Sequence, residues 1–594
     1  MKDFLKYVLA TVVGIIVVGL ICTIISVITL LGLASSSTVS VPNDAVLVLK
    51  LDGSIMERSQ DNPFGGVLGS STEQMGLDDV LKAISNAQNN DKVKGIYIEA
   101  GNFGGATPAQ LQEIRQALVK FKKSGKFIVS YGDQYTQGTY YLASVADSVV
   151  INPEGMIDWK GLSFQTLYYK DVLDKLGVKM EIFKVGTYKS AVEPYFLTEM
   201  SDANREQITV FSDEIWKQLQ SDVAKSRKIA YNQLNQLTDE GLTVKETNYY
   251  LKKKLVDKVA FSDEVPQMLA YCMNKTKAGD YNTISVEDLA ASTSNEPKGT
   301  SGNVIAVYYA AGDIVQSDES SLGSMGEVIA SDKVTKDLKD LADDDDVKAV
   351  VMRVNSPGGS AFASEQIWHQ VMNIKSKKPI IVSMGGYAAS GGYYISCAAD
   401  YIVAEPTTLT GSIGIFGVFP VAEELINKKI GIHANTVKTN QFADFGDYTR
   451  QMTEAEKNAL QSYINRGYEL FTKRCADGRK MSQDSIKAIA EGRVWTGEHA
   501  LKIGLVDKLG NLDDAIEIAK QRANVKEATI LSYPAKSSFF EQLMDKANNT
   551  DSYADAKMRE LLGPEFYNFF MNLRSLDKKG SVNARVPFYG NFNL

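Results

Sequence analysis

The sequence predicts an α/β fold made of two tandem copies of one domain, and two observations lead to this prediction. The first is an internal repeat, in which stretches of one half align on the other half at an offset of 253 or 254 residues. The second is the order of elements in each copy: a β-branched run ends in Gly-Gly, an amphipathic helix follows, and a second apolar run leads through a glycine turn into another helix. A repeat this long exceeds a solenoid unit, so a whole domain is duplicated. The aligned pairs are 93–105 with 347–359, 129–147 with 382–400, and 175–190 with 429–444.

The N-terminal segment is predicted to anchor the chain in a membrane. From Tyr7 to Ala34 there is no charged residue, and this run exceeds the apolar stretch of a cleavable signal peptide. Lys2 and Lys6 precede the run, so the positive-inside rule places the N-terminus in the cytoplasm and the body outside the cytoplasmic membrane. A small-x-small sequence at 32–34 leaves a cleaved signal peptide open as the alternative.

The rest of the chain divides where its composition changes. Residues 276–302 are polar and rich in turn formers, which is typical of a linker or an irregular connector. Beyond about residue 535 the second half has no counterpart in the first, and we expect a peripheral helix and a loose tail without an assigned function. The predicted organisation is an anchor (1–40), a first repeat (41–275), a linker (276–302), a second repeat (303–535) and a C-terminal extension (536–594).

Composition argues against several classes of function. The 64 basic and 72 acidic residues give a net charge of −8, without the basic excess of a nucleic-acid binder. The cysteines lie too far apart for a zinc or redox motif, and the histidines are too few for a histidine metal cage or a Ser-His-Asp triad. We therefore expect no metal, no cofactor and no nucleic-acid partner. The residues concerned are Cys22, Cys272, Cys397 and Cys475, and His369, His433 and His499.

The most informative stretch is IIVSMGGYAASGGYYISCAAD, residues 380–400. Ser390 follows an apolar strand and a glycine pair and opens a helical run, which is the position of a nucleophile on a strand-to-helix turn. A helix-capping serine is the alternative interpretation. A second glycine pair, in NSPGG at 355–359, follows the preceding strand, and backbone N–H groups there and at Gly391 could hold an oxyanion.

The duplication selects a base for this serine. A lysine can act as a general base if burial lowers its pKa, but many lysines are present. The counterpart of Ser390 in the first copy is Gln137, whereas Lys189 of the first copy aligns with Ala443 of the second. Each copy therefore carries half of a Ser-Lys dyad, and a composite site formed by both domains is predicted.

Five motifs in this order resemble the signal peptide peptidase A family, the long-form protease IV type, whose members are membrane-anchored Ser-Lys peptidases related in fold to ClpP and the crotonases. The resemblance implies a ClpP/crotonase-like fold for both repeats, a homotetramer, Ser390 as the nucleophile and Lys189 as the general base. It also implies that Ser412 orients the lysine, while the oxyanion is expected to bind near Gly359 and Gly391. The motifs are YKSAVEP around Lys189, NSPGG at 355–359, YAASGGYY around Ser390, LTGSIGIFG at 409–417 and GRVWTGEHALKIGLVDKLG at 492–510.

The expected function is that of a serine endopeptidase on the periplasmic side of the inner membrane, which degrades cleaved signal peptides and other unfolded apolar peptides. Two alternatives remain open at this point. A crotonase-like acyl-CoA hydratase or isomerase would use similar backbone N–H groups, and a non-catalytic scaffold would carry decayed sites. An SxxK match at Ser575 lies in the tail without a KTG partner, and we give it no role.

Overall fold

A computed structural model of the chain describes residues 39–59, 74–292, 302–317 and 327–536, the backbone of a strand at 582–585, and Gly14, Val18 and Gly19. Within these residues no helix combines the length and the apolar character needed to cross a bilayer. The run Tyr7–Ala34, where we expected the anchor, lies outside the described residues except at those three positions.

The first copy is built on a parallel sheet with the strand order β2-β1-β3-β4-β5-β7, and β8 pairs with β1. Apolar residues on both faces of the central strands give it a core that includes Leu47, Ile96 and Ile128. Its strands are β1 (Ala45–Met56), β2 (Gln74–Gly76), β3 (Val93–Gly105), β4 (Phe127–Tyr135), β5 (Ser148–Ile157), β7 (Lys258–Val259) and β8 (Asn282–Ile284). Its helices include α2 (Leu77–Asn89), α3 (Pro108–Lys122), α4 (Gln137–Ala143), α5 (Lys170–Leu176), α6 (Glu193–Phe196), α7 (Asp202–Arg227), α8 (Tyr231–Asp239), α9 (Thr247–Lys252), α10 (Val265–Cys272) and α11 (Val286–Ala291).

The second copy repeats this plan with the order β18-β16-β14-β12-β9-β20, and β15 and β19 extend it beside β14. The aligned stretches occupy matching places, because β3 and β4 of the first sheet correspond to β12 and β14 of the second. The α/β fold and the duplication are therefore confirmed. Its strands are β9 (Val304–Ala311), β12 (Val347–Ser356), β14 (Ile380–Ala389), β15 (Tyr401–Ala404), β16 (Leu409–Gly411), β18 (Val494–Thr496), β19 (Lys508–Leu509) and β20 (Thr529–Tyr533). Its helices are α12 (Ser331–Asp343), α13 (Ala361–Lys375), α14 (Gly391–Ser396), α15 (Glu454–Arg479), α16 (Gln483–Ile489), α17 (Gly497–Lys502) and α18 (Leu512–Arg522).

The range 276–302, expected as a linker, is structured over part of its length. β8 pairs with β1, and α11 packs on α2 through the buried side chains of Val286 and Leu289. Ser285 caps α11, because its hydroxyl accepts a hydrogen bond from the backbone N–H of Asp288. This segment therefore belongs to the first domain, and its polar composition had concealed the few apolar positions that hold it there.

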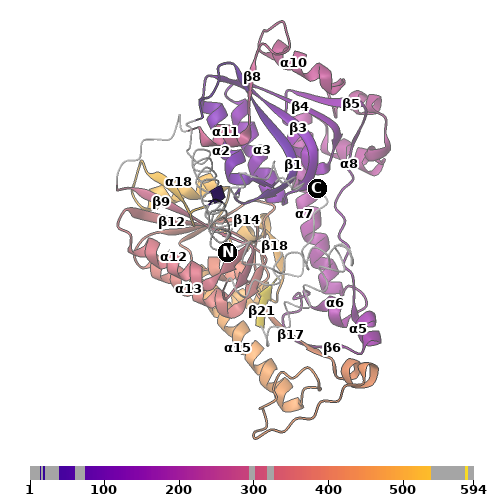
Figure 1. Ribbon diagram of the computed structural model, residues 1–594, viewed down its shortest axis with the longest axis vertical. Helices are drawn as coiled ribbons and strands as arrows, with labels where there is room; N and C mark the ends of the chain where they lie inside the picture. Colours follow the sequence, from indigo (N-terminus) through magenta and orange to yellow (C-terminus); the bar gives the residue numbers. More distant parts are fainter. Residues whose placement is uncertain are drawn as a thin grey trace, which may run out of the picture.

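A third sheet joins the two copies, in the order β11-β10-β13-β21-β17-β6. β6 comes from the first copy, and β17 of the second copy pairs with it in antiparallel fashion along its whole length. In Figure 1 the long helix α7 descends from the upper lobe, which is the first copy, toward α5, α6 and β6 beside β17 at the lower end. The first copy thus reaches along one side of the second. The strands are β6 (Lys179–Val185), β10 (Asp313–Val315), β11 (Val328–Ala330), β13 (Gly358–Ser360), β17 (Ile415–Val421) and β21 (Val582–Arg585).

Candidate active site

Ser390 lies between β14 and α14 in a backbone conformation that few side chains adopt. Its φ is 55° and its ψ −114°, so it is a positive-φ residue that is not glycine, and it is fully buried. Its backbone N–H donates to the carbonyl of Gly411 at 2.8 Å, and its carbonyl accepts from the N–H of Tyr394 at 2.8 Å. The side chain makes no helix-capping hydrogen bond. The capping interpretation is therefore wrong, and the strained turn aims the hydroxyl elsewhere.

Lys189 reaches this serine because β6 and β17 share a fixed register. Val185 at the end of β6 pairs with Ile415 at the start of β17, which brings the next residues of the first copy beside the turn before β17. Gly186 then turns the chain at a φ of 113°, and the N–H of Tyr188 donates to the carbonyl of Glu491 at 2.9 Å. The pairing of β6 with β17 thus places a lysine of the first copy beside the serine of the second.

Gly492 lets this loop approach closely. A Cβ at Gly492 would lie 2.6 Å from the Cβ of Lys189 and 2.7 Å from its backbone nitrogen, which is closer than any side chain permits. Only a residue without a Cβ fits against the lysine backbone here. Gly492 begins the last motif quoted above, but nothing in that motif indicates that its partner is Lys189, about 300 positions earlier.

The lysine amine lies among hydroxyl and carbonyl oxygens. Its Nζ is 2.7 Å from the Oγ of Ser390, and 3.0 Å from both the carbonyl oxygen and the Oγ of Ser412. A neutral amine has two N–H groups and one lone pair, which matches this set: two donations to Ser412 and one hydrogen bond accepted from the Ser390 hydroxyl. The Ser412 hydroxyl in turn donates to the carbonyl of Gly492 at 3.2 Å.

Burial favours this neutral form. Lys189 is fully buried, and the loss of hydration lowers its pKa well below its ordinary value. Desolvation causes this shift of the pKa, and among the residues that the structure describes no carboxylate offsets it. A lysine without its proton can accept one, so the arrangement suits a general base.

The two predicted oxyanion glycines lie side by side next to the serine. A Cβ at Gly391 would lie 3.1 Å from the backbone nitrogen of Gly359 and 2.7 Å from the Oγ of Ser364. A Cβ at Gly359 would lie 2.1 Å from the carbonyl oxygen of Ile314 in the neighbouring strand β10. Both positions need glycine because the backbones pack this closely. All five predicted site residues, Lys189, Gly359, Ser390, Gly391 and Ser412, are therefore brought together within one chain.

Polar contacts hold the loop that carries Lys189 against the second copy, and sequence reasoning missed them. Gln207 of α7 donates to the carbonyl of Tyr188 at 3.1 Å and accepts from the N–H of Val494 at 3.2 Å, so one amide connects the two copies. The guanidinium of Arg493 stacks on the Tyr188 ring at 4.6 Å and forms an ion pair with Glu206 at 2.9 Å. These residues have no pattern of their own in the sequence, because each acts only through a contact between distant segments.

The corresponding positions of the repeat hold no second dyad. Gln137 takes the place of Ser390 and is buried, and its amide bonds the loop at 160–161: its Oε1 accepts from the N–H of Lys160 at 3.0 Å and of Gly161 at 2.8 Å. Ala443, the counterpart of Lys189, lies exposed on the surface. The first copy thus uses this turn to fix a loop rather than to present a nucleophile.

The histidines lie elsewhere. His499 is 3.1 Å from Glu214 through its Nδ1 and lies beside the ring of Trp495, in the contact between α17 and α7. His433 is exposed, and His369 lies on α13. Among the residues that the structure describes, no group of three or more His, Cys, Asp or Glu side chains is placed to hold a metal ion.

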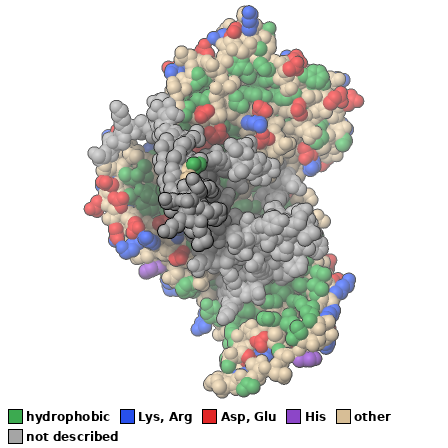
Figure 2. Space-filling model, in the orientation of Figure 1, with side chains coloured by type: hydrophobic (Ala, Val, Ile, Leu, Met, Phe, Trp, Pro, Cys, Tyr) green, Lys and Arg blue, Asp and Glu red, His purple; other side chains and the backbone are tan. Residues whose placement is uncertain are grey.

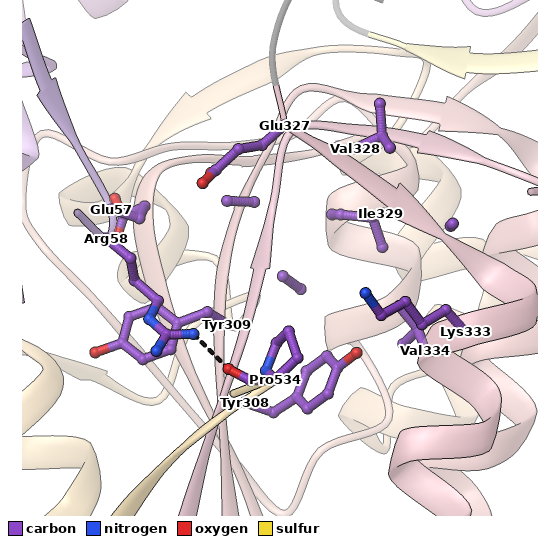
Figure 3. Close-up of a pocket in the computed structure, with 13 residues that line it drawn as sticks. Glu57, Arg58, Tyr308, Tyr309, Glu327, Val328, Ile329, Lys333, Val334 and Pro534 are labelled. Atoms are coloured by element: carbon purple, nitrogen blue, oxygen red, sulfur yellow. Dashed lines mark hydrogen bonds between the residues drawn. The ribbon is translucent and has the colours of Figure 1, made fainter. Parts of the chain in front are cut away.

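A separate cavity of about 200 Å³ lies between the copies and is lined in part by residues of β9 and β11 (Figure 3). Arg58 of the first copy enters it, stacks on the Tyr309 ring at 4.9 Å and donates to the carbonyl of Pro534 at 2.6 Å. Glu327 and Lys333 also line it, Glu327 at the top and Lys333 at the right in Figure 3. None of the five predicted site residues lines this cavity, so it is distinct from the dyad.

Comparison with known proteins supports a peptidase. Residues 120–275 and 372–526 each match the model of Peptidase family S49, and residues 307–408 match that of Clp protease. These matches confirm the tandem repeat and the ClpP-like fold, and they contradict the acyl-CoA hydratase alternative.

Several curated relatives are similar over most of their length. Protease 4 of Salmonella typhi is 39% identical over 516 residues, which cover 84% of this chain and 82% of the relative. Protease 4 of Haemophilus influenzae is 35% identical over 534 residues, covering 87% and 85%. The chloroplastic serine protease SPPA of Arabidopsis thaliana is 28% identical over 527 residues, covering 87% and 75%. The chain belongs to peptidase family S49 and is a serine protease.

Proposed function

We propose that this serine protease cleaves peptide bonds with Ser390 as its nucleophile and Lys189 as its general base. The observation that supports this most strongly is the 2.7 Å separation of the lysine Nζ from the serine Oγ, inside a site that keeps the amine unhydrated. Membership of the family makes the chain a protease, and the geometry supports the proposal that these two groups carry the reaction.

The reaction follows from these contacts. The neutral amine of Lys189 takes the hydroxyl proton of Ser390 while Oγ attacks the peptide carbonyl, and the backbone N–H groups of Gly359 and Gly391 stabilise the oxyanion. The lysine then gives that proton to the leaving amine as the C–N bond breaks, which leaves an acyl-serine. A water molecule, deprotonated by the same lysine, attacks the acyl carbon and restores the serine. Ser412 holds the amine in place throughout, because its carbonyl oxygen and its Oγ accept hydrogen bonds from the two N–H groups of Lys189.

The proposed substrates are cleaved signal peptides and other unfolded apolar peptides at the outer face of the inner membrane. Support comes from the resemblance of the five motifs and from the charge-free run Tyr7–Ala34, which would tether the body near peptides left in the bilayer. Protease added to intact spheroplasts should digest the body; a body protected in spheroplasts and digested only after lysis would contradict this orientation.

We also propose that copies of the chain assemble head to tail, as the homotetramer that the resemblance implies. The counterpart of β17 in the first copy, 162–168, and the counterpart of β6 in the second copy, 433–439, form no strand within the chain. The second of these segments is exposed throughout, and hydrophobic side chains gather on the lower lobe in Figure 2. Pairing the two segments between neighbouring copies would repeat the β6–β17 interface and close a ring.

This assembly can be tested at Val437, whose side chain is fully exposed in the single chain. Val437→Asp should lower the mass measured by light scattering to that of one chain, because a charge would be buried in the new strand pair. Val244→Asp, at another exposed valine outside both segments, should leave the mass unchanged. An unaltered mass for Val437→Asp would contradict the proposed interface.

The experiment that tests the dyad is labelling with a serine-directed fluorophosphonate, followed by mapping of the adduct. The adduct should lie on Ser390, and the labelling rate should fall as the pH falls through the pKa of Lys189, because protonation removes the base. Since burial lowers that pKa, the fall should occur well below the ordinary lysine range. An adduct on another serine, or a rate independent of pH, would exclude the dyad.

A further inference from the structure

The most unexpected element of the structure is the last strand, β21 (Val582–Arg585). It pairs in antiparallel fashion with β13, where Gly358, Gly359 and Ser360 lie opposite Arg585, Ala584 and Asn583. On its other side it pairs with β17, where Phe416 and Gly417 lie opposite Asn583 and Val582. A segment near the end of the chain thus completes the sheet that joins the two copies.

The position of this strand coincides with the proposed active site. β13 carries Gly359, one of the two oxyanion glycines, and β17 begins three residues after Ser412. β21 also lies against α14, the helix that Ser390 opens. A strand held between β13 and β17 therefore passes over the dyad, with Ala584 at the level of Gly359.

The pairing of β21 with β13 and β17 resembles the way in which an extended peptide adds as a strand to the edge of a sheet. β13 and β17 turn their free edges toward each other, and such edges bind a peptide strand by backbone hydrogen bonds. The space between these two edges is called the peptide slot below. β21 occupies it as a central strand, paired with β13 on one side and with β17 on the other. An external peptide that binds in the same way has no edge left to pair with while β21 is in place.

We propose that Val582–Arg585 is a tethered, substrate-like strand that fills the peptide slot over the dyad and must leave before an external peptide can bind. The inference rests on the proposed function, because it equates the slot with the substrate site. Residues 537–581 connect the strand to the body. Because the strand belongs to the same chain, its binding is intramolecular, so even a weakly binding strand competes well with free peptides.

The test removes the strand's pairing while leaving the chain complete. Ala584→Pro lacks a backbone N–H and cannot occupy a central strand, whereas Asn593→Pro, beyond the end of β21, serves as the matched control. With a short fluorogenic apolar peptide, Ala584→Pro should lower KM about tenfold and leave kcat unchanged. Asn593→Pro should behave as the parent chain.

A second measurement does not depend on catalysis. In the background of Ser390→Ala, a fluorescent synthetic peptide spanning residues 578–590 should bind about tenfold more tightly to the Ala584→Pro chain than to the chain with an intact tail. Equal binding to both would overturn the inference. If every chain is inactive but the binding difference remains, the proposed function fails and the inference about the slot stands.

The mass of the purified parent chain gives a further outcome. If the mass shows an intact C-terminus after prolonged incubation, the result supports a strand that competes with external peptides and is not itself cleaved. Loss of the tail by cleavage within 582–585, in the parent chain but not in Ser390→Ala, would overturn the inhibitory role and make the segment a substrate.

Discussion

Lys189→Met is expected to abolish peptidase activity, with a fall in kcat/KM of at least about 10⁴-fold, and at the same time to stabilise the folded chain. The loss of activity follows because methionine cannot accept the serine proton. The gain in stability follows because the native site buries an amine that the unfolded chain keeps hydrated and protonated. Methionine fills a similar volume without that cost, which is the usual conflict between activity and stability at a catalytic site.

The pH dependence of this stability difference has a definite sign. Between the lowered pKa of folded Lys189 and its ordinary value near 10.4, the unfolded chain binds a proton that the folded chain does not. The stability of the parent chain therefore rises with pH through this window, while Lys189→Met lacks this contribution. The advantage of the variant in thermal unfolding should be larger at pH 6 than at pH 9. A variant less stable than the parent at pH 6 would show that the lysine is not buried as a neutral amine.

Ser390→Ala should lose activity to the same extent, and the double variant should be no worse than either single one, because the two groups act as a unit. The matched control is Gln137→Ala, the same position in the first copy. It should retain activity in a peptide cleavage assay, although the loop at 160–161 loses its hydrogen bonds. Substantial activity in Lys189→Met, or its loss in Gln137→Ala, would contradict the assignment of roles to the two copies.

The site residues could be predicted from the sequence because the duplication supplied an internal comparison. Ser390 stood out from its own strand-to-helix turn, and the comparison with Gln137 and Ala443 at the counterpart positions then selected Lys189 among the many lysines. The comparison of the two copies could not show why the side chains of Ser390 and Lys189 meet. The reason lies in the register between β6 and β17, and the segment aligned with β17 in the first copy forms no strand at all. Pairing between segments about 230 residues apart leaves no periodic signal in either segment.

The contacts that fix the geometry escaped prediction for a related reason. Gln207, Arg493 and Gly492 each act on a residue of the other copy, and their own neighbours in sequence do not reveal that partner. The C-terminal strand is a stronger case. Residues 582–585 have no counterpart in the first copy, so the comparison that exposed the dyad could not assign them a place, and we expected a loose tail there.

Arg353→Met should destabilise the folded chain by about 3–5 kcal/mol, because it removes the positive charge from a buried network between the copies. Arg353 donates through Nε to Glu57 at 2.8 Å and through Nη2 to Glu113, and all three side chains are almost completely buried. Both glutamates belong to the first copy. Without the guanidinium, two carboxylates would remain in the interface without a counter-charge, and separation of the copies would also disrupt the dyad.

The loss of stability in Arg353→Met should depend on pH, because the buried glutamates around Arg353 change their protonation. Burial raises the pKa of Glu113 to about 7 even with Arg353 present, and it raises the pKa of nearby Glu405 to about 8. Between the ordinary glutamate pKa near 4.5 and these values the folded chain binds protons that the unfolded chain has released, so this contribution to stability falls as the pH rises. Protonated carboxyls tolerate the loss of Arg353 better than carboxylates do. The deficit of Arg353→Met in urea unfolding should therefore be smaller at pH 5.5 than at pH 8.5.

A matched control lies within the second copy. Arg479 pairs with Asp507 at 2.6 Å, but the side chain of Asp507 is 28% exposed and would stay hydrated if the arginine were lost. Arg479→Met should cost no more than about 1–2 kcal/mol, with little change between the two pH values. The triple variant Glu57→Gln, Glu113→Gln, Arg353→Met should recover most of the stability, because no unpaired charge remains. If Arg353→Met instead cost the same at both pH values, its effect would come from lost packing rather than from the buried carboxylates.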